Sequence, residues 1–149
     1  MEIIGSVSMI LSQKGSMVWS IAPDGLVFDA IQLMAGKNIG ALPVMENRRL
    51  VGIISERDYT RKVILKGKSS KETMVGEIMT RQLDIASPED SVEECMRLMT
   101  EKRIRHLPVL DGDEMVGMLS IGDVVKWIMS SQAAAIHHLQ QYITGEYPA

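Results

Sequence analysis

The sequence predicts an α+β fold in which two tandem β-α-β-β-α repeats pack as one pseudo-twofold module, followed by a C-terminal helix. Three observations support this prediction: an internal repeat, apolar residues at helical spacing, and two strand-like runs around a tight turn in each copy. Residues 18–65 align without a gap on residues 83–130 and share 13 identical pairs in 48 positions, where ordinary composition would give roughly three. Such a clear repeat is a better guide to the architecture than any single motif.

The first helix of each copy follows a proline. Apolar residues come after Pro23 at 27, 30, 31 and 34, and after Pro88 at 92, 95, 96 and 99. This spacing places them on one face of a helix of about three turns. In the second copy, Ser91 and Glu94 also have the spacing of a capping box. Cys95 lies on the apolar face, where we expect it to be a buried small hydrophobic residue.

The rest of each copy predicts a hairpin and a second helix. The short apolar runs ALPVM and LVGIIS in the first copy, and HLPVL and MVGMLS in the second, are separated by polar turns. Asp111-Gly112 is a strong hairpin signal at the second turn. The segments ERDYTRKVI and IGDVVKWIM then return to helical spacing, and Trp127 in the second is expected in the core or an interface.

The repeat sets the predicted boundaries. We expect a first repeat over residues 7–66, a linker over 67–76, a second repeat over 77–130, and a C-terminal helix and tail over 131–149. One copy of about 48 residues cannot easily enclose a core alone, whereas two copies can pack their sheets together. A basic stretch near the linker contains Arg61, Lys62, Lys66, Lys68 and Lys71. A solvated face is the favoured interpretation of this stretch, and an outer phosphate contact is the alternative.

Composition and charge exclude several classes of protein. The chain has 149 residues, 46% of them hydrophobic, with a net charge of −3, so it has no general attraction to nucleic acid or an anionic membrane. Its aromatic content of 4% leaves few platforms for base stacking. The single cysteine cannot form an internal disulfide, and the N-terminal apolar stretch is short and broken by Gly and Ser. We therefore expect no signal peptide or membrane span, and a cytoplasmic location.

The skeleton Gly-x-x-Ser-x-x-Asp occurs once in each copy, at 52–58 and 117–123. A Ser followed three residues later by an acid, just before an apolar run, resembles a helix capping box, so a purely structural role is one interpretation. A helix N-terminus also offers unpaired N–H groups that suit phosphate. A carboxylate there can accept hydrogen bonds from two vicinal hydroxyls. The residues alone leave both interpretations open.

Three basic side chains stand near these motifs. Arg57 begins the last helix of the first copy, where its guanidinium could hold phosphate oxygens bidentately; the alternative is a solvated first-turn arginine. Arg105 and His106 stand where the first copy has Gly40 and Ala41. They are two donors that could meet phosphate, with a histidine that is tunable near neutral pH, or polar residues at a surface strand end.

The patterns IGALPVMENRRLVGIISERD and IRHLPVLDGDEMVGMLSIGD, each preceded by IAPDG or ASPED and a helix, resemble the cystathionine-β-synthase (CBS) domain. Two such domains in tandem resemble a Bateman module, and the resemblance covers roughly residues 7–130. The chain is similar to small stand-alone bacterial CBS-pair proteins. The resemblance implies a homodimer with ligand sites in the clefts between the repeats, usually for AMP, ADP, ATP or NAD and sometimes for S-adenosylmethionine.

The resemblance also implies a role for each matching position. The Asp of each motif accepts hydrogen bonds from ribose hydroxyls, and the Ser reaches phosphate or ribose. Residues before each Leu-Pro line the base or phosphate, and the strand that enters each copy presents backbone groups to the base. The two sites are unequal, since Gly122 stands in the place of Arg57. The implied ligand-binding residues are Ser20, Ile21, Ala22, Ile39, Gly40, Ala41, Pro43, Ile54, Ser55, Arg57, Asp58, Ile85, Ser87, Ile104, Arg105, His106, Pro108, Leu119, Ser120 and Asp123.

Three classes of function remain open: a nucleotide sensor, an enzyme, and an interaction domain with empty clefts. The sequence has no nucleophile–base pairing, metal-ligand cluster or Walker-type loop, so we expect no enzymatic activity, catalytic cofactor or metal. We predict a regulatory module that binds an adenine nucleotide and acts on an effector protein through a ligand-induced conformational change. The alternative is a ligand-free module for protein–protein interaction or oligomerisation. The identity of the nucleotide, the number of filled clefts and the effector are not determined by the sequence.

Overall fold

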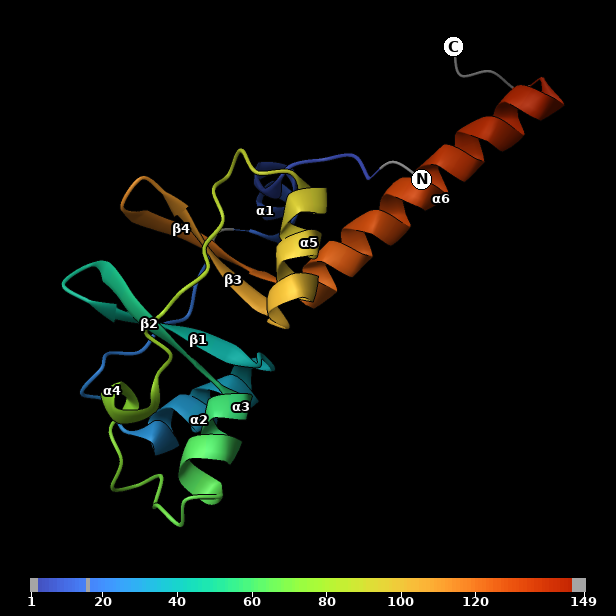
Figure 1. The fold of residues 1–149 in the computed structure, drawn as a ribbon. Helices are drawn as coiled ribbons and strands as arrows, with labels where there is room; N and C mark the ends of the chain where they lie inside the picture. The colour runs from blue at the N-terminus through green and yellow to red at the C-terminus, as the bar shows by residue number, and fades with distance from the viewer. Residues whose placement is uncertain (1–2, 16, 146–149) are drawn as a thin grey trace. The chain divides into compact units, whose positions relative to one another are not determined.

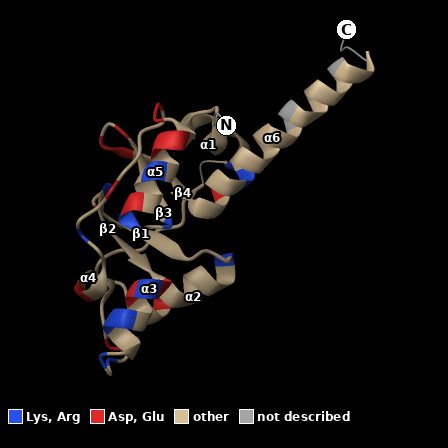
Figure 2. Ribbon diagram, turned by 45° about the vertical axis from the view of Figure 1, so that its right-hand side comes forward, with Lys and Arg blue, Asp and Glu red and all other residues tan. Residues whose placement is uncertain are grey.

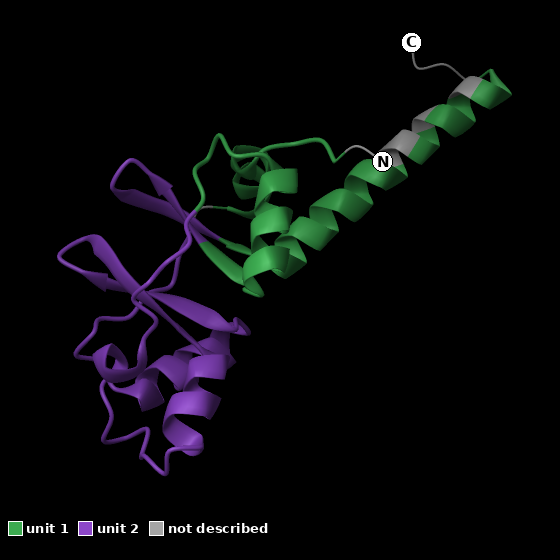
Figure 3. Ribbon diagram, viewed as in Figure 1, with its two compact units in different colours: residues 1–15, 86–107, 119–149 green, residues 16–85, 108–118 purple. Residues whose placement is uncertain are grey.

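The computed structural model of the chain describes residues 3–15 and 17–145, except for the side chains at 134, 135, 138 and 142. The fold is mixed α+β and consists of two compact units, coloured separately in Figure 3. One unit contains residues 16–85 and 108–118, and the other contains residues 1–15, 86–107 and 119–149. Within the described part of the chain, every helix is too short or too polar to cross a bilayer.

The unit of residues 16–85 and 108–118 is built on the predicted hairpin of the first repeat. Its strands β1 and β2 are antiparallel and pair Ala41 with Ser55 at the open end of the hairpin. A helix precedes the hairpin and another follows it, as the apolar spacing predicts. The elements are α2 (Val27–Lys37), β1 (Ala41–Glu46), β2 (Arg49–Ser55), α3 (Glu56–Tyr59), its π-helical continuation η1 (Thr60–Ile64), and the short helix α4 (Val75–Ile78).

The core of this unit combines the predicted apolar face of α2 with the hairpin and with two later helical segments. The core residues are buried because the apolar faces of these elements meet and remove apolar surface from water. The core residues are Val27, Ala30, Met34, Leu42, Val44, Ile54, Val63, Val75, Ile78 and Met79.

The other unit is mainly helical and contains α1 (Val7–Lys14), α5 (Val92–Lys102) and α6 (Ile121–Thr144). Strands β3 (His106–Asp111) and β4 (Glu114–Ser120) form the predicted second hairpin, most of which, residues 108–118, belongs to the unit of residues 16–85. Helix α6 is one continuous helix that joins the last helix of the second repeat to the predicted C-terminal helix (Figure 1). The predicted tail at 146–149 lies outside the described residues.

The start of α2 is completed by the segment that precedes the second repeat. The backbone N–H of Val27 donates to the carbonyl of Thr73 at 2.9 Å, and the N–H of Val75 donates to the carbonyl of Gly25 at 2.8 Å. The predicted linker over 67–76 therefore contributes hydrogen bonds to the first repeat, and α4 begins at its C-terminal end.

The start of α5 is completed in the same way by the segment that precedes the first repeat. The N–H of Val7 donates to the carbonyl of Asp90 at 2.9 Å, and the N–H of Val92 donates to the carbonyl of Gly5 at 3.0 Å. These bonds attach α1 to the second repeat, which explains why residues 1–15 belong to the same unit as α5 and α6. Helices α1 and α4 thus occupy equivalent places on the two repeats.

The strand predicted to enter each copy is reduced to a single bridge. Ile21 makes one parallel bridge with Val44 on the edge of β1, and only Ala86 of residues 85–87 makes a bridge. On the other edge of the first hairpin, Thr80 pairs with Ile53 through two backbone hydrogen bonds of 2.9 and 2.8 Å. The second bridge places the Thr80 side chain next to the end of β2.

Candidate functional site

The Ser-x-x-Asp motif of the first repeat forms the predicted capping box at the start of α3. The backbone N–H of Asp58 donates to Ser55 Oγ at 3.1 Å. In return, Asp58 Oδ2 accepts from the backbone N–H and from the hydroxyl of Ser55, each at 3.0 Å. The structural interpretation of this motif is therefore realised in the first repeat.

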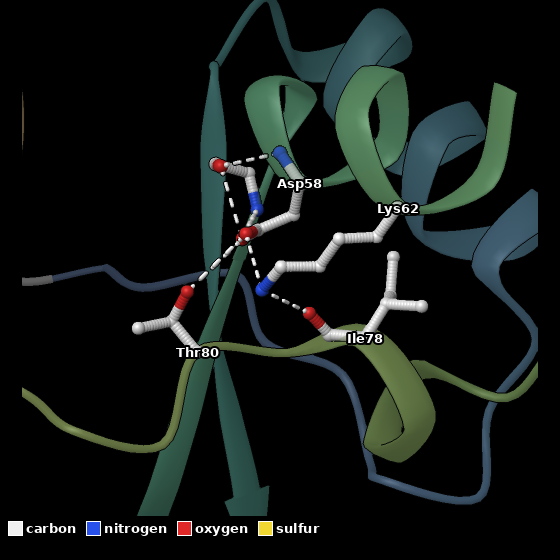
Figure 4. A network of polar contacts seen from close by, with 5 residues as sticks. Asp58, Lys62, Ile78 and Thr80 are labelled. Atoms are coloured by element: carbon white, nitrogen blue, oxygen red, sulfur yellow. Dashed lines mark hydrogen bonds and ion pairs between the residues drawn. The ribbon is translucent and has the colours of Figure 1, made fainter. Parts of the chain in front are cut away.

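Two further donors occupy the carboxylate of Asp58 (Figure 4). Thr80 Oγ1 donates to Asp58 Oδ1 at 3.2 Å, and Lys62 Nζ lies 2.9 Å from the same oxygen. Lys62 also donates to the carbonyl of Ile78 at 2.9 Å. The Asp58 side chain is only 11% exposed, so its hydrogen-bonding capacity is taken up by the protein. The Lys62 side chain is 43% exposed, in keeping with the expected solvated face, and its ammonium group pairs with this carboxylate.

The same motif in the second repeat has a different environment. Asp123 Oδ2 accepts from the backbone N–H of Ser120 at 2.8 Å, and the Asp123 N–H donates to Ser120 Oγ at 3.1 Å. Lys14 Nζ on α1 lies 2.6 Å from the same Asp123 oxygen. The Asp123 side chain is 22% exposed, so this carboxylate remains within reach of a small molecule.

Hydrogen bonds to Asp123 favour its ionised form. Burial by itself would raise the pKa of this carboxyl group, but the hydrogen bond from Lys14 and those from Ser120 outweigh it, and the pKa lies below its usual value of 3.8. Asp123 is therefore ionised at neutral pH and can accept hydrogen bonds from hydroxyl groups.

Trp127 explains why the second carboxylate takes its cation from another helix. It occupies the repeat position that corresponds to Lys62, four residues after the aspartate. Its indole Nε1 donates to the carbonyl of Ile4 at 2.7 Å. Its ring also lies against Gly5, where an added Cβ would come within 2.6 Å of Nε1. Trp127 thus belongs to a packed interface with the N-terminal segment, as predicted.

The residues before each Leu-Pro lie beside the helix starts. The N–H of Glu56 donates to the carbonyl of Gly40 at 3.1 Å, and the N–H of Ile121 donates to the carbonyl of Arg105 at 2.8 Å. Gly40 is thereby held next to Ser55, and Arg105 next to Ser120. The structure thus brings together these parts of the predicted site within each repeat.

His106 begins β3 near the Lys14–Asp123 pair. Burial lowers the pKa of this imidazole below its usual value of 6.5, and the positive charges of Lys14 and Arg105 act in the same direction against the opposing charge of Asp123. His106 is therefore neutral at pH 7, with one nitrogen that donates and one that accepts.

Other predicted residues take diverse places in the structure. Ile54 and Leu119 are fully buried, and Pro43 and Pro108 are buried as well, so these four can reach a ligand mainly through their backbone. The N–H of Ser87 donates to Asp90 Oδ2 at 2.8 Å and supports a turn. Exposed or half-buried positions are held by Ser20, Ile21, Ala22, Ile39, Arg57, Ile85 and Ile104.

Sequence reasoning missed Lys14 and Thr80, which contact the two aspartates. Both lie on the segments that complete the repeats, and these segments are 68 positions apart, not 65. Aligning VSMILS at 7–12 with VGEIMT at 75–80 matches two buried pairs, Val7 with Val75 and Ile10 with Ile78. This short extension of the repeat could have indicated that residues 7–12 and 75–80 have equivalent places. It is weak evidence, because only two of the six aligned pairs are identical in residue type.

Two other features lie away from the Ser-x-x-Asp motifs. A surface hollow runs along α2 and is lined by Ile21, Asp29, Gln32, Leu33, Gly36 and Lys37. Within residues 3–15 and 17–145, no group of three His, Cys, Asp or Glu side chains is arranged to hold a metal ion.

Comparison with known proteins gives consistent matches. The family model described as CBS domain matches residues 16–64 and 75–130. CBSX3, a mitochondrial CBS domain-containing protein of Arabidopsis thaliana, is 45% identical over 141 residues, which span 91% of this chain and 68% of that protein. The crystal structure of the CBS domain protein NE2398 is 52% identical, with a TM-score of 0.79 over 82% of this chain and 95% of the other. A candidate signal-transduction protein with CBS domains from Burkholderia ambifaria MC40-6 is 47% identical, with a TM-score of 0.83 over 86% and 96% of the two chains.

One similar structure is an oligomer. The hexameric CBS-CP12 protein from bloom-forming cyanobacteria is 30% identical to this chain, with a TM-score of 0.73 over 84% of this chain and 72% of that one.

Proposed function

Because the chain belongs to the CBS-domain family and carries two CBS domains in tandem, we propose that it is a sensor of adenine nucleotides that acts on an effector protein. CBS-pair proteins are commonly regulatory and signal-transduction modules. The proposed ligand is AMP, ADP, ATP or NAD, bound as a regulatory molecule and not as a catalytic cofactor. We assign the principal site to the second repeat.

The unequal state of the two aspartates carries this assignment. Asp58 is enclosed by four donor groups and is 11% exposed on its side chain. Asp123 is twice as exposed, at 22%, and its cation comes from a separate helix. A ligand hydroxyl can approach the more exposed Asp123 more easily than it can enter the network at Asp58, where four donor groups already occupy the carboxylate.

The groups around Asp123 match the parts of a nucleotide that AMP, ADP, ATP and NAD share. The ionised Asp123 would accept hydrogen bonds from the two ribose hydroxyls. Lys14, Arg105 and His106 supply donors for phosphate oxygens, and the 24-residue helix α6 directs its positive dipole end toward the same place. The base would contact backbone groups, which explains why the identity of the nucleotide is not readable from side chains.

Lys14 offers a route from the ligand to the rest of the chain. In the structure Lys14 is paired with Asp123, and α1 is fixed to the second repeat by the hydrogen bond from Val7. A bound phosphate would draw the Lys14 ammonium away from Asp123, so the ligand favours a different position of α1. The ligand can shift the equilibrium between the two positions of α1 only by as much as its affinity differs between them.

Several assignments remain part of this proposal. The predicted residues of the first repeat, with Arg57 and Ser20 among them, would take part in a second and weaker site there. We propose a homodimer, and the hexameric CBS-CP12 structure supports self-association of such modules. We also propose a cytoplasmic location, although the similar CBSX3 is named a mitochondrial protein.

A thermal-shift panel tests the proposal. The purified protein is heated with AMP, ADP, ATP, NAD, NADH or S-adenosylmethionine at millimolar concentration. A ligand present at 100 times its Kd adds about 2.7 kcal/mol of stability, which raises Tm by several degrees. A selective increase supports the sensor. If no nucleotide changes Tm, the sensor proposal fails and the ligand-free interaction module takes its place.

A further inference from the structure

Helix α6 carries a line of exposed apolar side chains. Their exposed fractions are 47% for Val125, 66% for Met129, 56% for Ile136, 61% for Leu139 and 80% for Ile143. Gln132 lies on the same line between Met129 and Ile136. The six positions follow one another at alternating steps of four and three residues, which is the a and d pattern of a coiled coil. We call these six residues the α6 seam.

The charged residues of α6 are confined to its first turns. Residues 127–144 contain no Asp, Glu, Lys or Arg, and Figure 2 shows charged residues on α6 only near its start. Ion pairs four residues apart therefore cannot support this part of the helix, and its last turn has no basic residue. Because helices in proteins derive most of their stability from packing of an apolar face, the seam requires a partner surface.

The absence of charge restricts the kind of partner. An anionic membrane surface or a nucleic acid would be met by Lys and Arg on the polar face of the helix, and residues 127–144 carry neither. A second α6 suits the seam, because two identical uncharged helices can approach without like-charge repulsion and bury the same apolar positions. We propose that α6 pairs with the α6 of a second copy as a parallel, two-stranded coiled coil.

Gln132 decides between the parallel and antiparallel arrangements. In a parallel pair, Gln132 faces Gln132, and the two amide groups can hydrogen-bond to each other, as single polar core residues do when they set the register of a coiled coil. In an antiparallel pair centred on the seam, Gln132 would face Ile136. That pairing would bury an amide group against an apolar side chain, at a cost in free energy.

This inference deepens the homodimer assigned in the proposed function, but it does not depend on nucleotide binding. Its test measures mass and cross-linking, whereas the sensor is tested by the change of Tm with nucleotide. Failure of one therefore leaves the other standing.

Cross-linking tests the register. The native Cys95 is 2% exposed, so a cysteine added on α6 reports on α6 alone. Under mild oxidation we expect Ile136→Cys to form a covalent dimer across the parallel seam. The matched control is Gln141→Cys, which lies on the opposite side of the same helix and should remain uncross-linked.

Sedimentation tests the seam itself. Leu139→Glu places a charge within the proposed interface and should weaken self-association at least about tenfold, whereas Gln141→Glu adds the same charge on the opposite face and should leave it unchanged. Equal behaviour of the two glutamate variants would overturn the α6 interface. Loss of association in Leu139→Glu without a disulfide in Ile136→Cys would overturn the parallel arrangement.

Discussion

The ammonium group of Lys14 lies 2.6 Å from Asp123 Oδ2, although the two residues are 109 positions apart in the chain. In the first repeat, the corresponding Asp58 takes its cation from Lys62, four residues later on the same helical segment. The repeats therefore balance equivalent carboxylates with lysines from unrelated places. The Asp58 carboxylate is enclosed by its donor groups at 11% exposure, whereas the Asp123 carboxylate is 22% exposed and is paired with a lysine on α1.

The two aspartates should differ in their contribution to stability. Asp58→Ala removes half of the capping box and leaves Thr80 and Lys62 without their acceptor, and we expect it to lower the free energy of unfolding by about 2–4 kcal/mol. Asp123→Ala should cost about 1 kcal/mol, because the pair it breaks is more exposed and Lys14 can turn to water. Urea unfolding of both variants measures the difference. Equal losses would show that the two networks are equivalent.

Gly52 should not tolerate a side chain. An added Cβ would lie 2.7 Å from Met79 Sδ and 3.0 Å from the carbonyl oxygen of Thr80, and Thr80 cannot shift easily because both its backbone groups bond to Ile53. We expect Gly52→Ala to cost about 1–3 kcal/mol. Gly36→Ala is the matched control, because it lies in α2 with no atom within 4 Å of the added Cβ. The control should stabilise the protein by about 0.5–1 kcal/mol, and a neutral Gly52→Ala would show that α4 does not pack firmly on β2.

The protein should become less stable as pH decreases below 6.5, because of His106. The folded protein lowers the pKa of this imidazole below 6.5, mainly by burial and then by the charge of Lys14. Below pH 6.5 the unfolded chain binds a proton that the folded chain does not, so the free energy of unfolding decreases as pH falls from 6.5 toward the folded pKa. Denaturation midpoints between pH 7.5 and 5.5 measure this slope. His106→Gln should flatten it, and an unchanged slope in that variant would assign the effect to other groups.

Cys95 should be chemically inert in the folded protein. Burial, with smaller contributions from the charges of Asp90 and Glu94, raises the pKa of this thiol to about 11, and its side chain packs in the core at 2% exposure. The reactive thiolate is therefore scarce at neutral pH. Iodoacetamide at pH 7.5 should label Cys95 slowly in the native protein and rapidly in urea. Rapid labelling without urea would show that α5 opens readily.

The sequence predicted those parts of the fold that depend on local pattern. The apolar spacing after Pro23 and Pro88 predicted α2 and α5, and the turn at Asp111-Gly112 predicted the second hairpin. These elements depend on short-range periodicity and turn chemistry, which a single sequence displays.

Contacts between distant segments were beyond such reasoning. Lys14 and Asp123 meet because α1 packs on the second repeat through backbone hydrogen bonds such as that from Val7 to Asp90. Backbone hydrogen bonds carry no sequence signature. The sequence therefore did not show that α1 packs on the second repeat and α4 on the first, or that each entering strand is reduced to a single bridge. The Ser-x-x-Asp motif was recognisable, but its role as a closed cap in one repeat and an accessible carboxylate in the other depends on these distant partners.

Calorimetric titration of nucleotide into Asp123→Asn and Asp58→Asn tests the central claim most directly. Both variants keep the shape of the side chain and remove one charge, and the nucleotide used is the one that raises the Tm of the wild-type protein most. If the second repeat holds the principal site, Asp123→Asn should weaken binding at least about tenfold, and Asp58→Asn should bind nearly as the wild type does. Binding that is lost in Asp58→Asn and preserved in Asp123→Asn would contradict the account.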